Sequence, residues 1–192
     1  MNKIATIKEH WEHPENYEAS WDERALIASQ MLGGANVICE IGCGPRMRLK
    51  SLIGDKVAYL PSDLTKWTDD VATCDLASGK FPVGDMVRSD ACVMLGVLEY
   101  LPNIESTFSM LGRYCDRIVF SYCSTDVSPD RWWLWINTYS SSDIIKLADS
   151  GGFTVTMKVA YHPGQFVFSA VNRRRSAAFR RAVASRLFRR TR

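Results

Sequence analysis

The stretch VICEIGCGPRMRLKSLIG, residues 37–54, decides the fold. It opens with an apolar strand over residues 37–41, in which Glu40 is a charge that a buried strand does not normally carry. The Gly42-Cys43-Gly44 sequence that follows predicts a sharp turn, because glycine adopts backbone conformations that other residues avoid. We expect the two glycines to let backbone N–H groups approach a ligand, and Glu40 to add a carboxylate.

After the turn, the spacing of the residues predicts a helix. Pro45 suits its first turn and Gly54 stands where a left-handed C-terminal cap is expected, while the apolar residues between them share one face: Leu49, Leu52 and Ile53. A strand, a glycine turn and a helix in this order form the place where an open α/β sheet holds its ligand. The chain is therefore expected to be a ligand-using enzyme rather than a bare scaffold.

The nature of the ligand follows from what the turn lacks. The dinucleotide-binding pattern requires a third glycine at a position occupied by Met47, and the sequence has no Gly-Lys-Ser/Thr phosphate loop. A second short strand, VAYLPSD at residues 57–63, ends in Asp63. A carboxylate at this place can accept hydrogen bonds from both hydroxyls of a ribose. These features predict a nucleoside-like ligand that carries no pyrophosphate.

Four segments make the sequence resemble the class I S-adenosylmethionine-dependent methyltransferases. They are EIGCG at 40–44, SDL at 62–64, CDLASGKFP at 74–82 and DACVMLGVLEYL at 90–101, in the order found in that family. The resemblance spans about residues 20–171, and it departs from the family at Arg46, where a further glycine is common. It implies an α/β fold with a doubly wound, mostly parallel Rossmann-like sheet and a terminal antiparallel hairpin strand.

The resemblance also implies S-adenosylmethionine as cofactor and a set of binding residues. The residues that it implies are Glu40, Gly42, Cys43, Gly44, Asp63, Leu64, Asp75, Leu76, Leu95 and Gly96. Glu40 and the turn would face the methionine end, Asp63 the ribose, Asp75 and Leu76 the adenine edge, and Leu95-Gly96 the floor. Each has a structural alternative, because the glycines could merely close a turn, Asp63 could cap a helix and Asp75 could cap a turn.

Length and composition indicate one domain. The chain has 192 residues, of which 46% are apolar and 23% charged, as in ordinary globular proteins. No run approaches the roughly 20 apolar residues of a transmembrane helix, and the N-terminus lacks the apolar region of a secretory signal. The six cysteines have neither disulfide-framework nor metal-ligand spacing. We therefore expect a cytoplasmic protein without a metal site.

Strands and helices alternate along the chain. Strands are expected near residues 36–41, 57–62, 71–75, 90–95, 117–122, 155–161 and 165–171. The last two are joined by the turn His162-Pro-Gly-Gln165, so they must be antiparallel. Ser20-Trp-Asp-Glu23 is a capping-box pattern for a helix through about Leu32. Asn103 is expected to cap a second helix, and a third is expected near 141–149.

The sequence says less about the residues that bind the methyl acceptor. Transfer to an O–H or N–H group needs alignment and a base, and no catalytic residue is assigned from the sequence. The candidates after the fourth and fifth strands are Glu99, Tyr100, Tyr122, Asp126 and Asp130. Each of them could instead be a helix-start charge, a half-buried aromatic or a solvated loop residue. Three tryptophans, Trp132, Trp133 and Trp135, could line an acceptor site or pack the loop onto the sheet.

The C-terminal residues 173–192 form a basic tail with nine arginines and no acid. The net charge of +3 therefore divides into +9 in this tail and −6 in the rest of the chain. The tail also carries an apolar stripe, Phe179, Val183 and Leu187, which predicts docking on an anionic membrane surface, at the inner face of a membrane, ahead of binding to nucleic acid. The alternative is a terminal helix or disordered tail that only solubilises the chain or leans on its acidic body. We expect a methyltransferase domain over residues 1–172, with an N-terminal helical segment over about 1–33, followed by this tail.

Functions of other classes also fit parts of the sequence. A catalytically inactive relative that binds the cofactor or a partner would keep the same fold. A nucleic-acid methyltransferase would explain the arginines, although the acidic body and the absence of an Asn/Asp-Pro-Pro-aromatic motif disfavour it. A narrower resemblance to small bacterial methyltransferases of polysaccharide biosynthesis favours a small-molecule or glycan acceptor, with O-methylation as the expected reaction.

Overall fold

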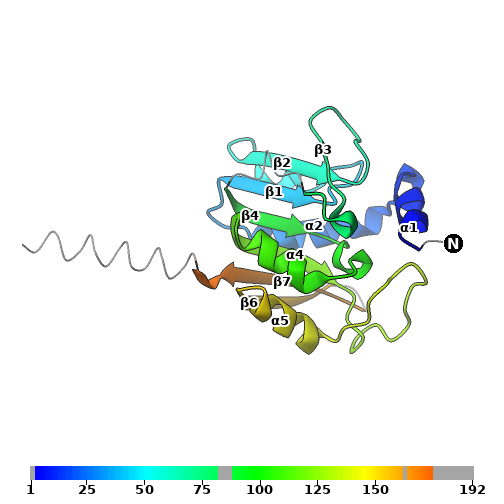
Figure 1. Ribbon diagram of the computed structural model, residues 1–192. Helices are drawn as coiled ribbons and strands as arrows, with labels where there is room; N and C mark the ends of the chain where they lie inside the picture. The colour runs from blue at the N-terminus through cyan, green and yellow to red at the C-terminus, as the bar shows by residue number, and fades with distance from the viewer. Residues whose placement is uncertain (1–2, 82–87, 162–163, 175–192) are drawn as a thin grey trace, which may run out of the picture.

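The computed structural model describes residues 3–81, 88–161 and 164–174. These residues form one seven-stranded sheet with the strand order β3-β2-β1-β4-β5-β7-β6 (Figure 1). In chain order the strands are β1 Val37–Ile41, β2 Ala58–Asp63, β3 Ala72–Thr73, β4 Ser89–Met94, β5 Cys115–Tyr122, β6 Phe153–Tyr161 and β7 Gln165–Asn172. Each predicted strand is present, with ends that lie within about two residues of the prediction.

The sheet is parallel from β3 to β5 and antiparallel beyond it. β1 pairs in parallel with β2 and with β4, whereas β7 lies antiparallel between β5 and β6. The predicted mostly parallel Rossmann-like sheet with a terminal antiparallel hairpin is thus confirmed. Of the turn that joins the hairpin, residues 162–163 lie outside the described residues.

The helices cover both faces of the sheet. Their bounds are α1 Lys3–Trp11, α2 Asp22–Gln30, α3 Lys50–Ile53, α4 Ile104–Leu111 and α5 Ser141–Ser150, with short 3₁₀ turns η1 Pro14–Asn16, η2 Ala19–Trp21, η3 Leu76–Ser78 and η4 Leu98–Tyr100. In Figure 1, α4 and α5 lie in front of the sheet and α2 behind it. The strands therefore bury side chains on both faces, as parallel sheets do.

Successive side chains of β5 point to opposite faces of the sheet and so contribute to the hydrophobic core on each face. Ile118 and Phe120 point to the α4–α5 face, where the Phe120 ring stacks on that of Phe168 with centroids 5.0 Å apart. Val119 points to the other face and packs with Ala28 of α2. Two predicted helices are confirmed. Asn103 caps α4, since its side chain accepts a hydrogen bond from the Ser106 N–H, and α5 occupies the predicted third position.

Two helix starts differ from the prediction. The Ser20 hydroxyl donates to Glu18 rather than capping a helix, and α2 begins at Asp22 without a side-chain cap. Pro45 does not begin a helix either, because the chain stays in turns until Lys50. Gly54 has a positive φ of 78° but a ψ of 158°, so it ends α3 without the predicted left-handed cap.

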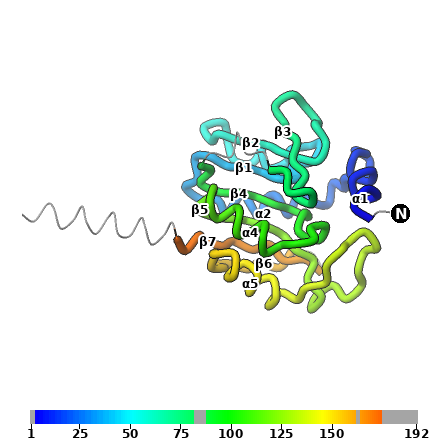
Figure 2. Tube along the Cα trace, viewed as in Figure 1, coloured from blue at the N-terminus to red at the C-terminus, as the bar shows by residue number. Residues whose placement is uncertain are grey.

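The N-terminal segment lies across one end of the sheet. Figure 2 shows α1 beyond the carboxyl ends of β1 and β4, on the same side as the loop of residues 123–140. The carboxyl ends of parallel strands are where open α/β sheets place their ligands. At the opposite end, contacts continue past the predicted domain boundary, because the Arg173 side chain pairs with Asp149. No helix among the described residues is long and apolar enough to cross a membrane.

Candidate active site

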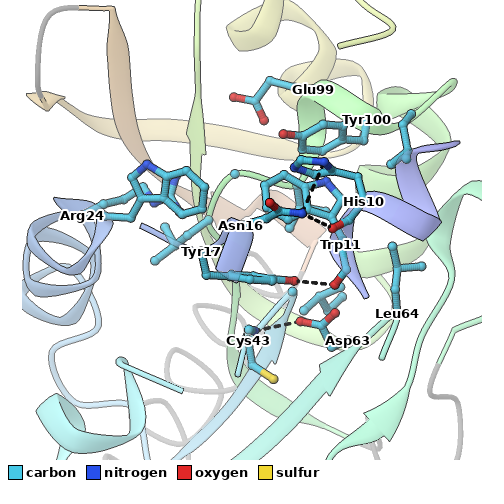
Figure 3. A pocket seen from close by; sticks show the side chains of 18 of the residues that line it. His10, Trp11, Asn16, Tyr17, Arg24, Cys43, Asp63, Leu64, Glu99 and Tyr100 are labelled. Atoms are coloured by element: carbon cyan, nitrogen blue, oxygen red, sulfur yellow. Dashed lines mark hydrogen bonds between the residues drawn. The ribbon is translucent and has the colours of Figure 1, made fainter. Parts of the chain in front are cut away.

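A cavity of about 910 Å³ opens between the carboxyl ends of β1, β2 and β4 and the N-terminal segment. This volume falls in the range of about 300–1,000 Å³ that is typical of small-molecule sites. All ten residues predicted to bind the cofactor line it: Glu40, Gly42, Cys43, Gly44, Asp63, Leu64, Asp75, Leu76, Leu95 and Gly96. Figure 3 shows Asp63 and Cys43 at one end and Glu99 and Tyr100 at the other, with Trp11 and Tyr17 between them.

The glycine turn is shaped by close neighbours as well as by its backbone. Gly42 and Gly44 have φ values of 78° and 64°, in the left-handed region that favours glycine. A Cβ on Gly42 would lie 2.5 Å from Cγ2 of Val97, and one on Gly44 would lie 3.0 Å from the Tyr17 ring. A side chain at either place would push Val97 or Tyr17 out of position.

The N–H groups of this turn are already used by β2. Those of Gly42 and Cys43 donate to the Ser62 carbonyl at 2.8 and 3.2 Å, and that of Gly44 donates to the Asp63 carboxylate at 2.8 Å. The expectation that these N–H groups are offered to a ligand is therefore wrong. The glycines instead let Val97 and Tyr17 pack directly against the turn.

Asp63 is held firmly at the end of β2. Its side chain is 4% exposed, and its carboxylate accepts from the N–H of Gly44 and, at 3.4 Å, from that of Thr65. No helix begins directly after Asp63, because the next element of the described chain is β3, so the helix-cap alternative does not apply. Burial raises the pKa of its carboxyl group. A carboxylate has about four acceptor positions, so two protein donors leave room for the hydroxyls of a ligand.

Glu40 is the second buried carboxyl group at this end. It is 3% exposed and accepts a hydrogen bond from the Tyr59 hydroxyl. Burial is the main cause that raises the pKa of Glu40 to about 8, and the nearby Asp63 charge acts in the same direction. Glu40 therefore holds its proton at neutral pH.

The adenine-edge and floor residues have structural roles as well. The Asp75 side chain accepts from the Ser78 N–H at 3.2 Å, so it caps η3, as its structural alternative predicted. Gly96 has a φ of 71°, and its N–H donates to the Ser121 hydroxyl at 2.8 Å. A Cβ on Gly96 would lie 2.8 Å from Nη1 of Arg24, so this part of the chain packs closely against α2.

Arg24 and Glu99 are two further charged residues that line the cavity. The Arg24 guanidinium donates to Gln165 at a long 3.4 Å, and its buried Nε donates to no described residue. Glu99 is 1% exposed, and its Oε1 accepts from the Cys123 N–H at 2.7 Å. Burial raises the pKa of Glu99 and lowers that of Arg24, while attraction between the two charges opposes both shifts.

An aromatic wall covers the cavity on the side of the N-terminal segment. Trp11 of α1 packs edge-to-face on Tyr100 and Trp132, with ring centroids 5.6 and 5.9 Å apart. His10 packs on Trp132 at 5.1 Å. Trp135 also lines the cavity, whereas Trp133 is 62% exposed and does not. The loop tryptophans thus both pack together and line the cavity, so the two interpretations of them do not exclude each other.

Only two of the five candidate bases reach the cavity, namely Glu99 and Tyr100. The Tyr122 hydroxyl is used inside the protein, donating to Asn137 and accepting from the Tyr139 N–H. Asp126 accepts from the backbone and hydroxyl of Ser141 at the start of α5. Asp130 lies in the exposed part of the same loop and does not line the cavity.

Comparison with known proteins places this geometry in a fold family. A scan against protein-family models and a search of curated proteins found no match. Solved structures with similar folds include the pyocyanin biosynthetic protein PhzM, with a TM-score of 0.55 and 14% identity over 78% of this chain and 55% of that protein. The chain thus spans little more than half the length of PhzM.

Two further structures match over most of both chains. The first is the 1,6-didemethyltoxoflavin-N1-methyltransferase of Burkholderia thailandensis, with a TM-score of 0.63 and 14% identity over 88% of this chain and 86% of that protein. The second is the magnesium protoporphyrin IX methyltransferase of Synechocystis PCC 6803, with a TM-score of 0.56 and 16% identity over 89% of this chain and 100% of that protein. Both of those proteins were solved with S-adenosylhomocysteine bound. The chain has the class I methyltransferase fold.

The cavity residues that the sequence did not predict lie outside the four segments that carry the methyltransferase motifs. Arg24 and Trp11 belong to the N-terminal segment and Gln165 to β7, and no pattern in their own segments marks them. Arg46 was noted only as a departure from the family. Its side chain forms a 3.0 Å ion pair with Asp22, so it fastens the glycine turn to the N-terminal segment.

A metal centre finds no support in the described part of the chain. Across residues 3–81, 88–161 and 164–174, no three His, Cys, Asp or Glu side chains are grouped so that they could hold an ion. The basic tail, residues 173–192, is predicted to dock on membranes. The structure describes only its first two residues, and residues 175–192 lie outside the described residues.

Proposed function

We propose that this protein is an S-adenosylmethionine-dependent methyltransferase that acts on a small molecule, with O-methylation as its reaction. One observation carries the proposal. Asp63, a buried carboxylate at the end of β2, lies on the same cavity as the glycine turn after β1 and is bonded to it. This is the arrangement that a nucleoside ligand needs in an open α/β sheet, and it occurs here in a methyltransferase fold.

The residues on the cavity fit S-adenosylmethionine in their chemistry. The Asp63 carboxylate would accept from the ribose hydroxyls, Leu64 would line the sugar site, and Asp75 and Leu76 would border the adenine. Gly42, Cys43 and Gly44 would leave room for the methionine part beside Glu40, while Leu95 and Gly96 would form the floor.

Arg24 extends this fit to the charged end of the cofactor. Within the described residues, no carboxylate oxygen lies within 4.0 Å of its guanidinium, and its buried Nε has no acceptor. A partly buried guanidinium that no carboxylate contacts directly is costly, so this position favours an added anionic group. The carboxylate of the methionine part would supply that group.

The protein contributes alignment and exclusion of water. Bound S-adenosylmethionine supplies a methyl group that is already activated by the sulfonium. The chain holds the methyl donor and the methyl acceptor in one cavity, and the aromatic wall that includes Trp11 and Trp132 excludes water from it. A glycan acceptor is one form of this proposal, and docking of the basic tail on an anionic membrane would bring a lipid-linked acceptor close.

Binding of the cofactor product gives the most direct test. Isothermal titration calorimetry with S-adenosylhomocysteine should show binding to the full chain and at least about tenfold weaker binding to Asp63→Ala, since two hydrogen bonds to a charged acceptor are lost. Asp69→Ala is the matched control, because Asp69 is an exposed loop residue that forms an ion pair with Lys66. Asp63→Asn keeps an acceptor for the Gly44 N–H and separates loss of the ligand contact from loss of the turn.

The proposal fails if the folded wild-type chain binds neither S-adenosylmethionine nor S-adenosylhomocysteine. It also fails if Asp63→Ala and Asp69→Ala bind with the affinity of the wild type. Far-UV circular dichroism of each variant checks that a loss of binding is not a loss of fold.

A further inference from the structure

Three buried polar atoms without partners lie on residues that line the cavity. They are Nε1 of Trp11, Nε of Arg24 and Oε2 of Glu99. Buried polar atoms in native proteins nearly always have partners, so each of these indicates a ligand group of opposite character. The cofactor carboxylate accounts for Arg24. Glu99 and Trp11 are left for a second ligand at the far end.

One carboxylate oxygen of Glu99 accepts a hydrogen bond within the protein, and the other is available to a ligand. Oε1 takes the Cys123 N–H at 2.7 Å, which fixes the carboxyl group, while Oε2 has no hydrogen-bond partner among the described residues. The residue is 1% exposed and lies in η4, shortly after β4 and the floor residues Leu95 and Gly96. A carboxylate in this position calls for a donor on the ligand, either O–H or N–H.

The surroundings of Glu99 are aromatic. Tyr100, Trp11 and Trp132 all line the cavity and have ring centroids 5.6 to 6.2 Å apart in pairs. Their edge-to-face packing forms a stiff wall of ring faces and edges. A flat aromatic ring gains both burial and ring–ring contact on such a wall.

We propose that the acceptor is a flat aromatic ring bearing a hydroxyl group, and that Glu99 takes the proton of this hydroxyl during methyl transfer. This inference rests on the proposed function and names the substrate class of the same cavity. The hydroxyl donates to Oε2 of Glu99, and the ring lies against Trp11, Tyr100 and Trp132.

The step is balanced in atoms and electrons. An oxygen lone pair of the acceptor forms the new C–O bond to the methyl carbon, and the C–S bond breaks with its electron pair on sulfur. The hydroxyl proton passes to Oε2 of Glu99 and afterwards to solvent. The products are a methyl ether and a neutral thioether.

Other groups on the cavity suit this role less well. The Tyr100 hydroxyl accepts from Nε1 of Trp135 at 3.3 Å, and burial raises its pKa, so it holds its own proton. Nδ1 of His10 lies 3.4 Å from the Asn16 amide nitrogen. An imidazole that accepts there carries its proton on Nε2 and presents a donor rather than a base. Burial raises the pKa of Glu99, which makes its carboxylate a stronger base.

The test uses the full chain saturated with S-adenosylhomocysteine and para-nitrophenol as probe, because the ionised form of this phenol absorbs visible light. We expect saturable binding with an apparent pKa of the bound phenol above that of the free one, since the Glu99 carboxylate disfavours a second negative charge. Glu99→Gln keeps an acceptor for the Cys123 N–H but removes the charge, so it should abolish this upward shift. Trp132→Ala should weaken probe binding about tenfold, whereas its exposed neighbour Trp133→Ala should not change it.

The outcomes separate this inference from the proposed function. If Glu99→Gln binds S-adenosylhomocysteine as the wild type does and loses the shift, both stand. If the wild type binds S-adenosylhomocysteine but not para-nitrophenol, or if Glu99→Gln leaves the bound pKa unchanged, the acceptor proposal is overturned while the cofactor site stands. Tighter binding of benzylammonium than of the phenol would overturn the hydroxyl assignment in favour of an amine. Failure of all forms to bind S-adenosylhomocysteine would remove the proposed function itself.

Discussion

Replacing Glu40 by glutamine should stabilise the empty protein, and the gain should grow with pH. Glu40 is 3% exposed, and burial raises its pKa from 4.5 to about 8. In the unfolded chain the group loses its proton near pH 4.5, whereas in the folded chain it keeps it to about pH 8. Its contribution to stability is therefore complete below pH 4.5 and is lost as the pH rises toward 8.

The magnitude follows from the size of this shift. Each pKa unit corresponds to about 1.4 kcal/mol, so the full shift removes roughly 4–5 kcal/mol of unfolding free energy between acid and mildly alkaline pH. The amide of Glu40→Gln has nearly the same shape, carries no charge and still accepts from the Tyr59 hydroxyl. For a chain of this length a difference of that size moves the melting temperature by about 10 °C or more.

Urea unfolding of the wild type and Glu40→Gln at a series of pH values from 5 to 8 measures the effect. The two unfolding free energies should be similar at pH 5 and should diverge steadily toward pH 8, with the variant more stable. Glu12→Gln is the matched control, because Glu12 is an exposed glutamate just after α1. Curves for Glu40→Gln and the wild type that stay parallel across this range would refute the reasoning.

Three further outcomes are expected. Gly44→Ala should lower the urea midpoint by the equivalent of about 1–2 kcal/mol, because φ is 64° and Tyr17 is close, whereas Gly33→Ala, with open space around it, should have no such cost. A chain that ends at Arg174 keeps the Arg173–Asp149 pair, so its melting temperature should equal that of the full chain. At low salt, the fraction that sediments with anionic vesicles should be at least about tenfold smaller than for the full chain. Equal sedimentation of the two forms would exclude docking by the tail. Binding of S-adenosylhomocysteine should be the same with and without a chelator, and restoration of lost binding by a divalent ion would contradict this.

Much of the sheet could be predicted because its signals are local. The apolar strands and the hairpin alternation of residues 153–172 depend on neighbours in sequence, and the structure has strands at each place. The cavity residues from Glu40 to Gly96 could be predicted for the same reason, since each follows the carboxyl end of a strand or lies in it.

The failures trace to contacts between distant segments. Ser20 matches a capping box, but its carbonyl accepts from the Tyr161 hydroxyl at 2.5 Å and its own hydroxyl donates to Glu18. Pro45 has a sequence suited to a first helical turn, yet Met47 has a positive φ of 41°, which a right-handed helix does not allow, and Arg46 pairs with the distant Asp22. Arg24 was missed because its relation to Gly96 exists only after the N-terminal segment packs across the sheet.

The place of β7 has a consequence for how the protein is made. β7, residues 165–172, is the last strand of the described sheet in chain order, yet it pairs on one side with β5 and on the other with β6. Until these residues leave the ribosome, the buried strand β5 has an unpaired apolar edge, which is a template for wrong pairing. The nascent chain is therefore expected to need shielding by a chaperone from the synthesis of β5 until β7 is inserted.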